Sequence, residues 1–390
     1  MTGETHPTNP CVMIIAGEAS GDLHGAALIA AMKKIDRSIF FCGIGGGRMK
    51  SQGLAALADS SEMAVMGITE IFSRIFTIFK ISKAVKAALL EWRPDLLILI
   101  DYPGFNLPMA EFAKKNGIPV LYYISPKVWA WRRGRVKKIE KYVDHLALIF
   151  PFEVDFYKNY HITTTFVGNP LLDYSPEPPP DKSIERERLL CVGLLPGSRE
   201  AEISRLFPVM LKSAPALVER LGKRVRFLIS VAPSVDREKM RRIFNQEDPQ
   251  GEFEFVEGDV RQVFDRVRFV IAASGTVTLE AAIALIPMVI IYKMSPVTFF
   301  LGRLFIKLNH VGLASIIAGE EAAPELLQEE ANPLAIAETA YRFLSDDALY
   351  AATLEKLKTI RERLGGPGAS ERTARIALEM ITRKGCRVEQ

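Results

Sequence analysis

Short apolar runs alternate with longer amphipathic stretches along the whole chain. In the first half, apolar runs of strand length predict β-strands over 11–16, 39–44, 96–101, 119–124, 145–150 and 164–167. Amphipathic stretches predict helices that begin near residues 22, 68, 106, 134 and 153. Alternation of this kind is typical of a parallel sheet covered by helices on both faces.

The pattern starts again after a proline-rich segment at 176–181, which we interpret as a linker because prolines in series cannot continue a helix or a sheet. Beyond it, strands are predicted over 190–195, 225–231, 253–256, 269–272 and 288–292. Helices are predicted over 200–221, 235–245, 260–265, 276–285, 296–308, 333–345 and 347–364. Glycine and proline at 365–368 end the last of these, and a final helix follows over about 370–384.

We therefore predict two Rossmann-like domains, over 1–175 and 176–365, with a terminal helix over 366–390 that crosses back to the first domain or to a partner chain. A length of 390 residues suits two domains, and a composition of 48% hydrophobic and 25% charged residues is ordinary for a globular protein. Two such α/β domains, with parallel sheets that face a central cleft, form the GT-B architecture of glycosyltransferases. From the pattern alone, a two-domain reductase and a sugar-nucleotide epimerase also remain open.

Charge and cysteine usage narrow the class of protein. A net charge of +4 is too small to indicate a nucleic-acid partner. A basic cluster over 127–138 fits either a solvated helix start or a patch for an anionic substrate or membrane surface. The four cysteines form no C-x-x-C pair, which favours buried thiols in a reducing cytosol over disulfides or a zinc site. We expect no signal peptide and no membrane-spanning helix.

The turn Pro196-Gly197-Ser198-Arg199 after the predicted strand 190–195 is a candidate phosphate-binding loop. Gly197 lets main-chain N–H groups approach an anion, the helix that follows favours negative charge at its start, and Arg199 can bind two phosphate oxygens. The loop has neither the P-loop pattern nor G-x-G-x-x-G, so a P-loop NTPase is excluded and a dinucleotide site is disfavoured. A plain strand-to-helix turn is the alternative.

A second candidate loop, Ser274-Gly275-Thr276, joins the predicted strand 269–272 to a helix. Ser274 or Thr276 can cap that helix, or the loop amides can hold phosphate. Glu280, one turn inside the helix, can accept hydrogen bonds from a ribose diol; an ordinary surface glutamate is the alternative. Two anion loops in the same half favour the functional interpretation.

Asp101 follows the apolar run Leu96–Ile100 directly and precedes Tyr102-Pro103. An acid at the carboxyl end of a parallel strand points into the crevice where such folds bind ligands. A partly desolvated carboxylate there can act as general base toward a sugar hydroxyl. The alternative is an aspartate in a turn or helix cap ahead of proline.

Glycine-bearing loops also follow the first two predicted strands. They allow a bulky or charged ligand to approach the main chain closely. The residues are Glu18, Ser20, Gly21 and Asp22 in the first loop and Gly45, Gly46 and Gly47 in the second. The absence of G-x-G-x-x-G disfavours a dehydrogenase, and the absence of Asp-x-Asp disfavours a transferase that holds its donor through a metal ion.

The run 66–80 is the most strongly amphipathic stretch. Its apolar positions at helical spacing are Ile68, Ile71, Phe72, Ile75, Phe76 and Phe79, and its polar positions are Glu70, Ser73, Arg74, Thr77 and Lys80. A core-facing helix is the usual explanation, but phenylalanines flanked by basic residues also suit a bilayer interface. A similar stretch spans 299–308. Two of them fit an enzyme that binds a lipid.

The motifs of the chain, in their order, resemble those of the lipid A disaccharide synthase family of inverting GT-B glycosyltransferases. The resemblance runs from about residue 11 to 380. In the first half it rests on Ala16–Asp22, Gly45–Met49, Met66–Glu70, Asp101–Asn106, Ser125–Arg132 and Pro151–Glu153. In the second half it rests on Leu195–Arg199, Ser274–Glu280 and Ala318–Gln328. So many matches in one order make the resemblance highly specific.

The resemblance implies transfer of diacylglucosamine from UDP-diacylglucosamine to the 6-hydroxyl of lipid X, which is diacylglucosamine 1-phosphate. Asp101 matches the family's general base. The positions that match the UDP site are Gly197, Ser198, Arg199, Ser274, Gly275, Thr276, Glu280 and, as a substitute residue, Ser315. The positions expected in the acceptor loops are Glu18, Ser20, Gly21, Asp22, Gly46 and Asn106, and Phe72, Phe76 and Phe79 are expected at the acyl chains or membrane.

The same resemblance implies a cytoplasmic enzyme that is peripheral to the inner membrane, uses no cofactor or metal, and forms a homodimer. The chain departs from the family pattern in two places: Ala314-Ser315 replaces Pro-Asn, and Asn169 replaces His. Ala314-Ser315 keeps open a non-catalytic sugar-nucleotide or lipid-binding protein. A UDP-sugar epimerase on the same fold is the other alternative.

Overall fold

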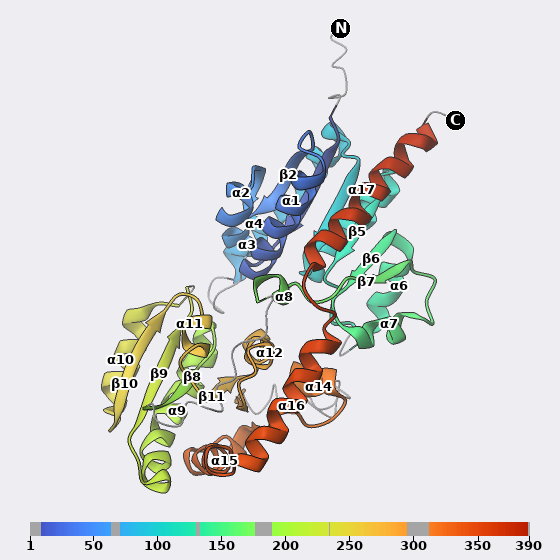
Figure 1. Ribbon diagram of the computed structural model, residues 1–390. Coiled ribbons are helices and arrows are strands. Elements are labelled where there is room, and N and C mark those ends of the chain that lie inside the picture. Colours follow the sequence, from blue (N-terminus) through green and yellow to red (C-terminus); the bar gives the residue numbers. More distant parts are fainter. Residues whose placement is uncertain are drawn as a thin grey trace. The chain divides into compact units, whose positions relative to one another are not determined.

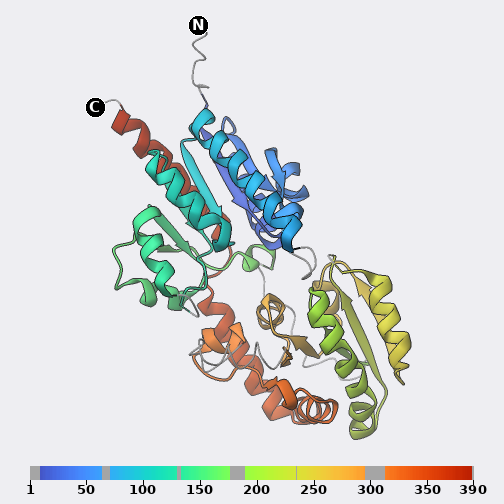
Figure 2. The ribbon, with the colours of Figure 1, turned by 180° about the vertical axis from the view of Figure 1, so that it is seen from behind.

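The computed structural model describes residues 9–63, 71–129, 133–175, 189–233, 235–294 and 312–388, without the side chains of 71–75, 133 and 384–388. The predicted linker at 176–181, the predicted helix at 296–308 and the motif Met66–Glu70 lie outside these residues. The chain divides into two compact units, one made of Met1–Tyr174 with Leu364–Gln390 and the other of Ser175–Arg363. Figures 1 and 2 show the elements of each unit from opposite sides.

The first unit contains, in its described part, a seven-stranded parallel sheet with the order β3-β2-β1-β4-β5-β6-β7. Its strands are β1 (Cys11–Ala16), β2 (Phe40–Gly45), β3 (Leu54–Asp59), β4 (Leu96–Ile100), β5 (Val120–Tyr123), β6 (His145–Leu148) and β7 (Thr164–Phe166). Its helices are α1 (Ala19–Ile35), α2 (Gly47–Ser51), α3 (Ser60–Met63), α4 (Ile71–Trp92), α5 (Pro103–Lys115), η1 (Arg133–Arg135), α6 (Val136–Tyr142), α7 (Pro151–Tyr157), α8 (Leu171–Tyr174) and α17 (Ala369–Val388).

The central strands of this sheet are buried on both faces. Every residue of β1 and β4 is buried, which explains why these strands are uninterrupted apolar runs in the sequence. Helices α1 and α17 pack together on one face, and α4 and α5 cover the other (Figures 1 and 2). Because side chains alternate along a strand, neighbouring residues such as Tyr122 and Tyr123 in β5 face different helices.

The carboxylate of Asp173 joins α17 to the rest of the first unit. It accepts hydrogen bonds from the main-chain N–H groups of Gly368, Ala369 and Ser370, at 2.6, 3.0 and 2.9 Å, which are the first groups of α17. These N–H groups have no partner inside a helix, so a carboxylate satisfies them and favours the positive end of the helix dipole. Arg372 adds a hydrogen bond of 2.7 Å to the carbonyl of Val167.

The second unit contains, among its described residues, a six-stranded parallel sheet with the order β10-β9-β8-β11-β12-β13. Its strands are β8 (Leu190–Leu195), β9 (Val225–Val231), β10 (Glu252–Glu257), β11 (Phe269–Ala273), β12 (Met288–Tyr292) and β13 (Glu325–Leu327). Its helices are α9 (Glu200–Leu221), α10 (Arg237–Glu247), α11 (Arg261–Phe264), α12 (Thr276–Ile283), α14 (Leu313–Ala318), η3 (Gln328–Glu330), α15 (Pro333–Ser345) and α16 (Asp347–Arg363).

Local sequence signals set the ends of the helices in this unit. Helix α9 stops at Gly222, whose φ of 59° lies in the left-handed region that glycine adopts without a steric cost. Helix α15 begins at Asn332, whose side chain accepts the N–H of Ala335 at 3.0 Å, with Pro333 in the first turn. Both helices then bury an apolar stripe against the sheet.

The structure confirms the predicted alternation and adds elements that the pattern did not reveal. Each predicted strand is present within about two residues of its predicted ends. The elements that sequence reasoning missed are α2, β3, α3 and α8 in the first unit and α14 and β13 in the second. Among the described helices, none combines the length and the apolar composition needed to cross a bilayer.

We predict that Asp173→Ala loosens α17 from the first unit, because three main-chain donors lose a charged acceptor. Such an acceptor is worth about 2 kcal/mol, so hydrogen-exchange protection of the α17 amides should fall at least tenfold. The control is Asp155→Ala, since that exposed carboxylate pairs with Lys158 at 2.5 Å, at the end of the same helix. Unchanged protection in Asp173→Ala would show that packing alone holds α17.

Candidate functional site

Strand order locates one candidate site in each unit. In an open parallel sheet, ligands bind at the carboxyl ends of the strands where the order reverses. The first sheet reverses between β1 and β4, and the second reverses between β8 and β11. The loops at these points begin at Gly17 and Asp101 in the first unit and at Pro196 and Ser274 in the second. These loops carry most of the residues predicted from the sequence.

Asp101 stands directly after β4 in an unusual main-chain conformation. Its φ is 44° and that of Tyr102 is 45°, so two consecutive residues other than glycine adopt the left-handed region. Such residues are strained and gather at functional sites. The ring of Tyr102 lies against Gly17, where a Cβ atom would come within 2.5 Å of it, and its hydroxyl donates to the carbonyl of Met63 at 3.1 Å. Gly17 therefore makes room for the turn at Asp101.

The carboxyl group of Asp101 is partly buried and electrostatically perturbed. Burial raises its pKa from 3.8 to about 6, the ammonium of Lys127 lowers it, and the carboxylate of Glu18 raises it. The charges of Glu18 and Lys127 thus act on the same carboxyl group, although their residues follow different strands. A carboxylate with a pKa near 6 is ionised at neutral pH and is more basic than an exposed aspartate, which suits a general base.

Another buried carboxylic acid supports the loop that carries Lys127. Glu153 lies in the first turn of α7, is fully buried, and accepts N–H groups from Phe150 and Ile149 at 3.1 and 3.3 Å. It also accepts the indole N–H of Trp129 at 3.3 Å, two residues after Lys127. Burial raises the pKa of Glu153 to about 8, against these hydrogen bonds. In the sequence, Glu153 stands out only as the last residue of the family motif Pro151–Glu153, which gives it no role.

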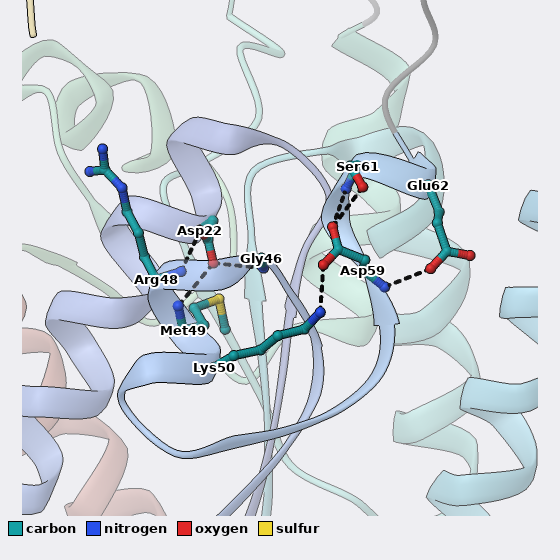
Figure 3. A network of polar contacts seen from close by, with 8 residues as sticks. All are labelled: Asp22, Gly46, Arg48, Met49, Lys50, Asp59, Ser61 and Glu62. Atoms are coloured by element: carbon teal, nitrogen blue, oxygen red, sulfur yellow. Dashed lines mark hydrogen bonds and ion pairs between the residues drawn. The ribbon is translucent and has the colours of Figure 1, made fainter. Parts of the chain in front are cut away.

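Asp22 and Gly46, both predicted in the acceptor loops, are bonded to each other. The buried carboxylate of Asp22 accepts main-chain N–H groups from Gly46, Arg48 and Met49 at 2.6, 3.1 and 3.0 Å (Figure 3). A Cβ atom at Gly46 would come within 2.7 Å of this carboxylate, which explains the glycine. Asp22 therefore fixes the start of α2 against α1. Glu18 and Ser20 are exposed at the edge of the same loop, and Gly21 is buried against Ala16.

Beside this contact, Asp59 at the end of β3 holds the start of α3. Its carboxylate pairs with Lys50 at 2.5 Å and accepts both the N–H and the hydroxyl of Ser61 (Figure 3). These hydrogen bonds lower the pKa of Asp59 to about 2. Together with Asp22, this network ties the loops after β2 and β3 to α1, and it leaves the rim of the first loop to Glu18 and Ser20.

In the second unit, the candidate phosphate loop follows β8. Gly197 has a φ of 103°, and Ser198 and Arg199 are exposed. Helix α9 starts there without a side-chain cap, so its first N–H groups can bind an anion. The guanidinium of Arg199 pairs with Glu202 at 2.9 Å, and Glu202 also lies against Gly197.

The second loop follows β11, the neighbour of β8 in the sheet. Gly275 and Thr276 are exposed, and α12 begins at Thr276 without a side-chain cap. The hydroxyl of Thr278 donates to the carbonyl of Gly275 at 2.7 Å and shapes the turn. Burial and nearby Asp259 raise the pKa of Glu280. Neighbouring strands therefore present two uncapped helix starts at one end of this sheet, which is an arrangement that can hold a pyrophosphate.

Two of the residues that depart from the family pattern, Ser315 and Asn169, have hydrogen-bond partners in the structure. Ser315 is fully buried, and its hydroxyl accepts the N–H of Ala322 at 3.2 Å. Asn169 is buried as well: its N–H donates to the carbonyl of Leu364 at 2.9 Å and its side-chain oxygen accepts the N–H of Leu171 at 3.0 Å. In the described part of the chain, no group of three or more His, Cys, Asp and Glu side chains is arranged to hold a metal ion.

Comparison with known sequences gives close relatives over nearly the whole chain. The family described as lipid-A-disaccharide synthetase matches residues 12–380. The lipid-A-disaccharide synthase of Syntrophus aciditrophicus (strain SB) is 43% identical over 380 residues, which cover 96% of this chain and 99% of that protein. That of Geobacter sulfurreducens is 44% identical over 384 residues, which cover 97% and 99%.

Solved structures resemble the fold at low sequence identity. A UDP-GlcNAc 2-epimerase from Neisseria meningitidis, bound to UDP-GlcNAc, gives a TM-score of 0.62 at 12% identity, over 95% of this chain and all of that chain. A glycosyltransferase from Rickettsia africae gives 0.54 at 10% identity, over 96% and 99%. These similarities confirm the predicted GT-B fold, which transferases and epimerases share.

We predict that Asp101→Asn stabilises the protein at pH 8 but not at pH 4. Burial raises the pKa of Asp101 in the folded state, so the stability linked to its protonated form is complete below pH 3.8 and is lost as the pH rises through about 6. The neutral variant should gain about 1–3 kcal/mol at pH 8, visible in thermal unfolding. Asp155→Asn is the exposed control, and a gain equal at both pH values would contradict the burial argument.

Proposed function

The chain belongs to the lipid-A-disaccharide synthase family and is a glycosyltransferase of lipid A biosynthesis, and we propose that it transfers diacylglucosamine from UDP-diacylglucosamine to lipid X. Membership of the family implies a UDP-sugar donor. The acceptor in this proposal is the 6-hydroxyl of diacylglucosamine 1-phosphate. The products are a β-1,6-linked disaccharide 1-phosphate and UDP.

The observation that carries the proposed chemistry is the placement of Asp101 at the reversal point of the first sheet, with a pKa of about 6. Its carboxylate takes the proton from the 6-hydroxyl as that oxygen attacks the anomeric carbon of the donor. The bond from this carbon to the β-phosphate oxygen breaks, and UDP leaves with the electron pair. Attack from the side opposite to UDP inverts the anomeric configuration, which gives the β linkage.

The second unit holds UDP in this proposal. The N–H groups at the starts of α9 and α12 and the guanidinium of Arg199 balance the charge of the pyrophosphate, and Glu280 accepts hydrogen bonds from the ribose. Arg199 then exchanges its partner Glu202 for phosphate oxygens. Stabilising the departing UDP in this way lowers the barrier electrostatically. Ser315 contributes to the donor site indirectly in this proposal. Its hydroxyl accepts the main-chain N–H of Ala322 and so holds the loop that follows α14.

The acyl chains of both substrates require an apolar surface, and α4 presents one. Phe76 and Phe79 are 70% and 69% exposed, so the core interpretation of the amphipathic run does not hold for these two residues. Lys80 and Lys83 are exposed and follow Phe76 and Phe79 by four residues each, so Lys80 lies on this face and not on the opposite face as predicted. Phenylalanines beside lysines fit the interface of an anionic bilayer. The side chain of Phe72 and the second Phe-rich stretch at 299–308 lie outside the described residues.

We therefore place the enzyme at the cytoplasmic surface of the inner membrane, and we further propose the homodimer that the family resemblance implies.

Two rival functions remain testable. Given UDP-diacylglucosamine, the purified protein should release UDP only when lipid X is also present. Turnover of the UDP-sugar without an acceptor would indicate an epimerase, and binding without turnover would indicate a carrier.

We predict that Asp101→Asn lowers turnover by about two to four orders of magnitude, the usual weight of general-base catalysis. The measurement is UDP release with both lipid substrates at saturation. UDP affinity, measured by calorimetry, should stay unchanged because the second unit carries the donor site. Turnover near that of the wild type would remove Asp101 from the role of base.

We predict that Phe76→Ser with Phe79→Ser weakens binding to vesicles that contain anionic lipid at least tenfold, because two exposed rings no longer enter the bilayer. Vesicle sedimentation gives the affinity. The thermal stability should not fall, since both rings are exposed in the folded protein. Leu334→Ser, at a side chain 66% exposed on α15, is the matched control and should bind as the wild type does. Equal binding by the double variant would refute this surface.

A further inference from the structure

We propose that Tyr122 and Asn106 are positioning residues for the transfer reaction. Their buried donors hold the main-chain carbonyl of Asp101 and thereby fix the direction of its carboxylate. This inference rests on the proposed role of Asp101 as general base and extends it to two fully buried residues, so that Asn106, which the resemblance places in an acceptor loop, acts through Asp101.

The main chain at Asp101 needs support because its conformation is unfavourable. Asp101 and Tyr102 both have φ values in the left-handed region, at 44° and 45°. A residue with a Cβ atom keeps such a conformation only where its surroundings impose it. Without that support the turn after β4 relaxes, and the carboxylate of Asp101 changes direction with it.

Three hydrogen bonds to the main chain of Asp101, and a fourth to the carbonyl of Ile100 beside it, impose the conformation of this turn. The hydroxyl of Tyr122 donates to its carbonyl at 2.6 Å, and the side-chain amide of Asn106 donates to the same carbonyl at 2.7 Å. The Asn106 amide also donates to the carbonyl of Ile100 at 3.1 Å. The N–H of Asp101 donates to the carbonyl of Tyr123 at 3.2 Å. Strand β5 and helix α5 therefore hold Asp101 from two sides.

The chemistry of the two donors makes this contact specific. Carbonyl oxygens only accept hydrogen bonds, so the amide of Asn106 must direct its nitrogen toward Ile100 and Asp101. Both Tyr122 and Asn106 are fully buried, and burial raises the pKa of Tyr122 well above its usual value. The hydroxyl therefore stays protonated and donates throughout the working range of pH. Hydrogen bonds shielded from water hold their geometry more strongly than exposed ones.

Two adjacent tyrosines in strand β5 allow a matched pair of variants. Tyr122→Phe keeps the buried ring and deletes only the hydroxyl that reaches Asp101. Tyr123→Phe deletes a hydroxyl from the next residue, which is equally buried but lies beside Ser370 and Thr373 of α17. Any general effect of losing a buried hydroxyl from β5 should appear in both variants, whereas an effect on positioning should appear only in Tyr122→Phe.

The test measures kcat and KM for UDP release in these variants, alone and combined with Asp101→Asn. We expect Tyr122→Phe to lower kcat about tenfold or more, with KM for the acceptor within about twofold. Tyr123→Phe should keep kcat within about twofold. In the Asp101→Asn background, Tyr122→Phe should cost less than about twofold, because residues that act through one group are not additive. Asn106→Ala, which removes both amide bonds, should lower kcat at least as much.

The results test the general-base role of Asp101 and the positioning roles of Tyr122 and Asn106 separately. Wild-type kcat in Tyr122→Phe, with Asp101→Asn impaired, overturns the positioning role of Tyr122 and leaves the base in place. Wild-type kcat in Asn106→Ala does the same for Asn106. An equal loss from Tyr122→Phe in both backgrounds shows a structural effect and also overturns the inference. Wild-type turnover in Asp101→Asn removes the base and the positioning role together.

Discussion

Burial of both faces of a parallel sheet is the constraint on which each unit depends. Strands such as β1 and β8 are apolar throughout, and helices must cover them on both sides to remove that surface from water. The loops at the carboxyl ends of the strands are then free to contact ligands, and the reversal of strand order separates neighbouring loops there. Asp101 and the loop at Gly197 stand at such reversals. The candidate residues Asp101 and Arg199 therefore lie in loops at these ends and not within the sheets.

The buried acids of the first unit differ in role: some hold loops in place, and Asp101 is the proposed general base. Asp22 and Glu153 are buried acids whose oxygens are occupied by main-chain N–H groups, so they fix loops rather than meet a substrate. Asp101 differs, because its main chain is held by neighbours while burial perturbs its carboxyl group. The same burial that makes the carboxylate more basic also destabilises its ionised form. A carboxyl group with a raised pKa and a strained main chain thus occur in the same turn.

Much of this arrangement follows from the sequence, and the exceptions have physical causes. Strands buried on both faces can be predicted because they are uninterrupted apolar runs. Asp101 can be predicted as a site residue because it directly follows one of these runs. Strand β3 is alanine-rich and half-exposed at the edge of its sheet, and β13 has three residues, so neither shows strand periodicity. Tyr122 has the pattern of a core residue, and its partner lies 21 residues earlier in the chain. Helical spacing alone could not decide between core and membrane for Phe76, because both environments select the same stripe.

Helix α17 packs on α1 within the first unit, although the whole second unit separates them in sequence. During synthesis on the ribosome, the second unit emerges as one continuous segment and can fold as soon as it is complete. Until α17 leaves the exit tunnel, the first unit lacks one of the helices that cover this face of its sheet, and α1 lacks the helix it packs against. The part translated first is therefore the last to be finished, and it is the part exposed longest to chaperones and proteases.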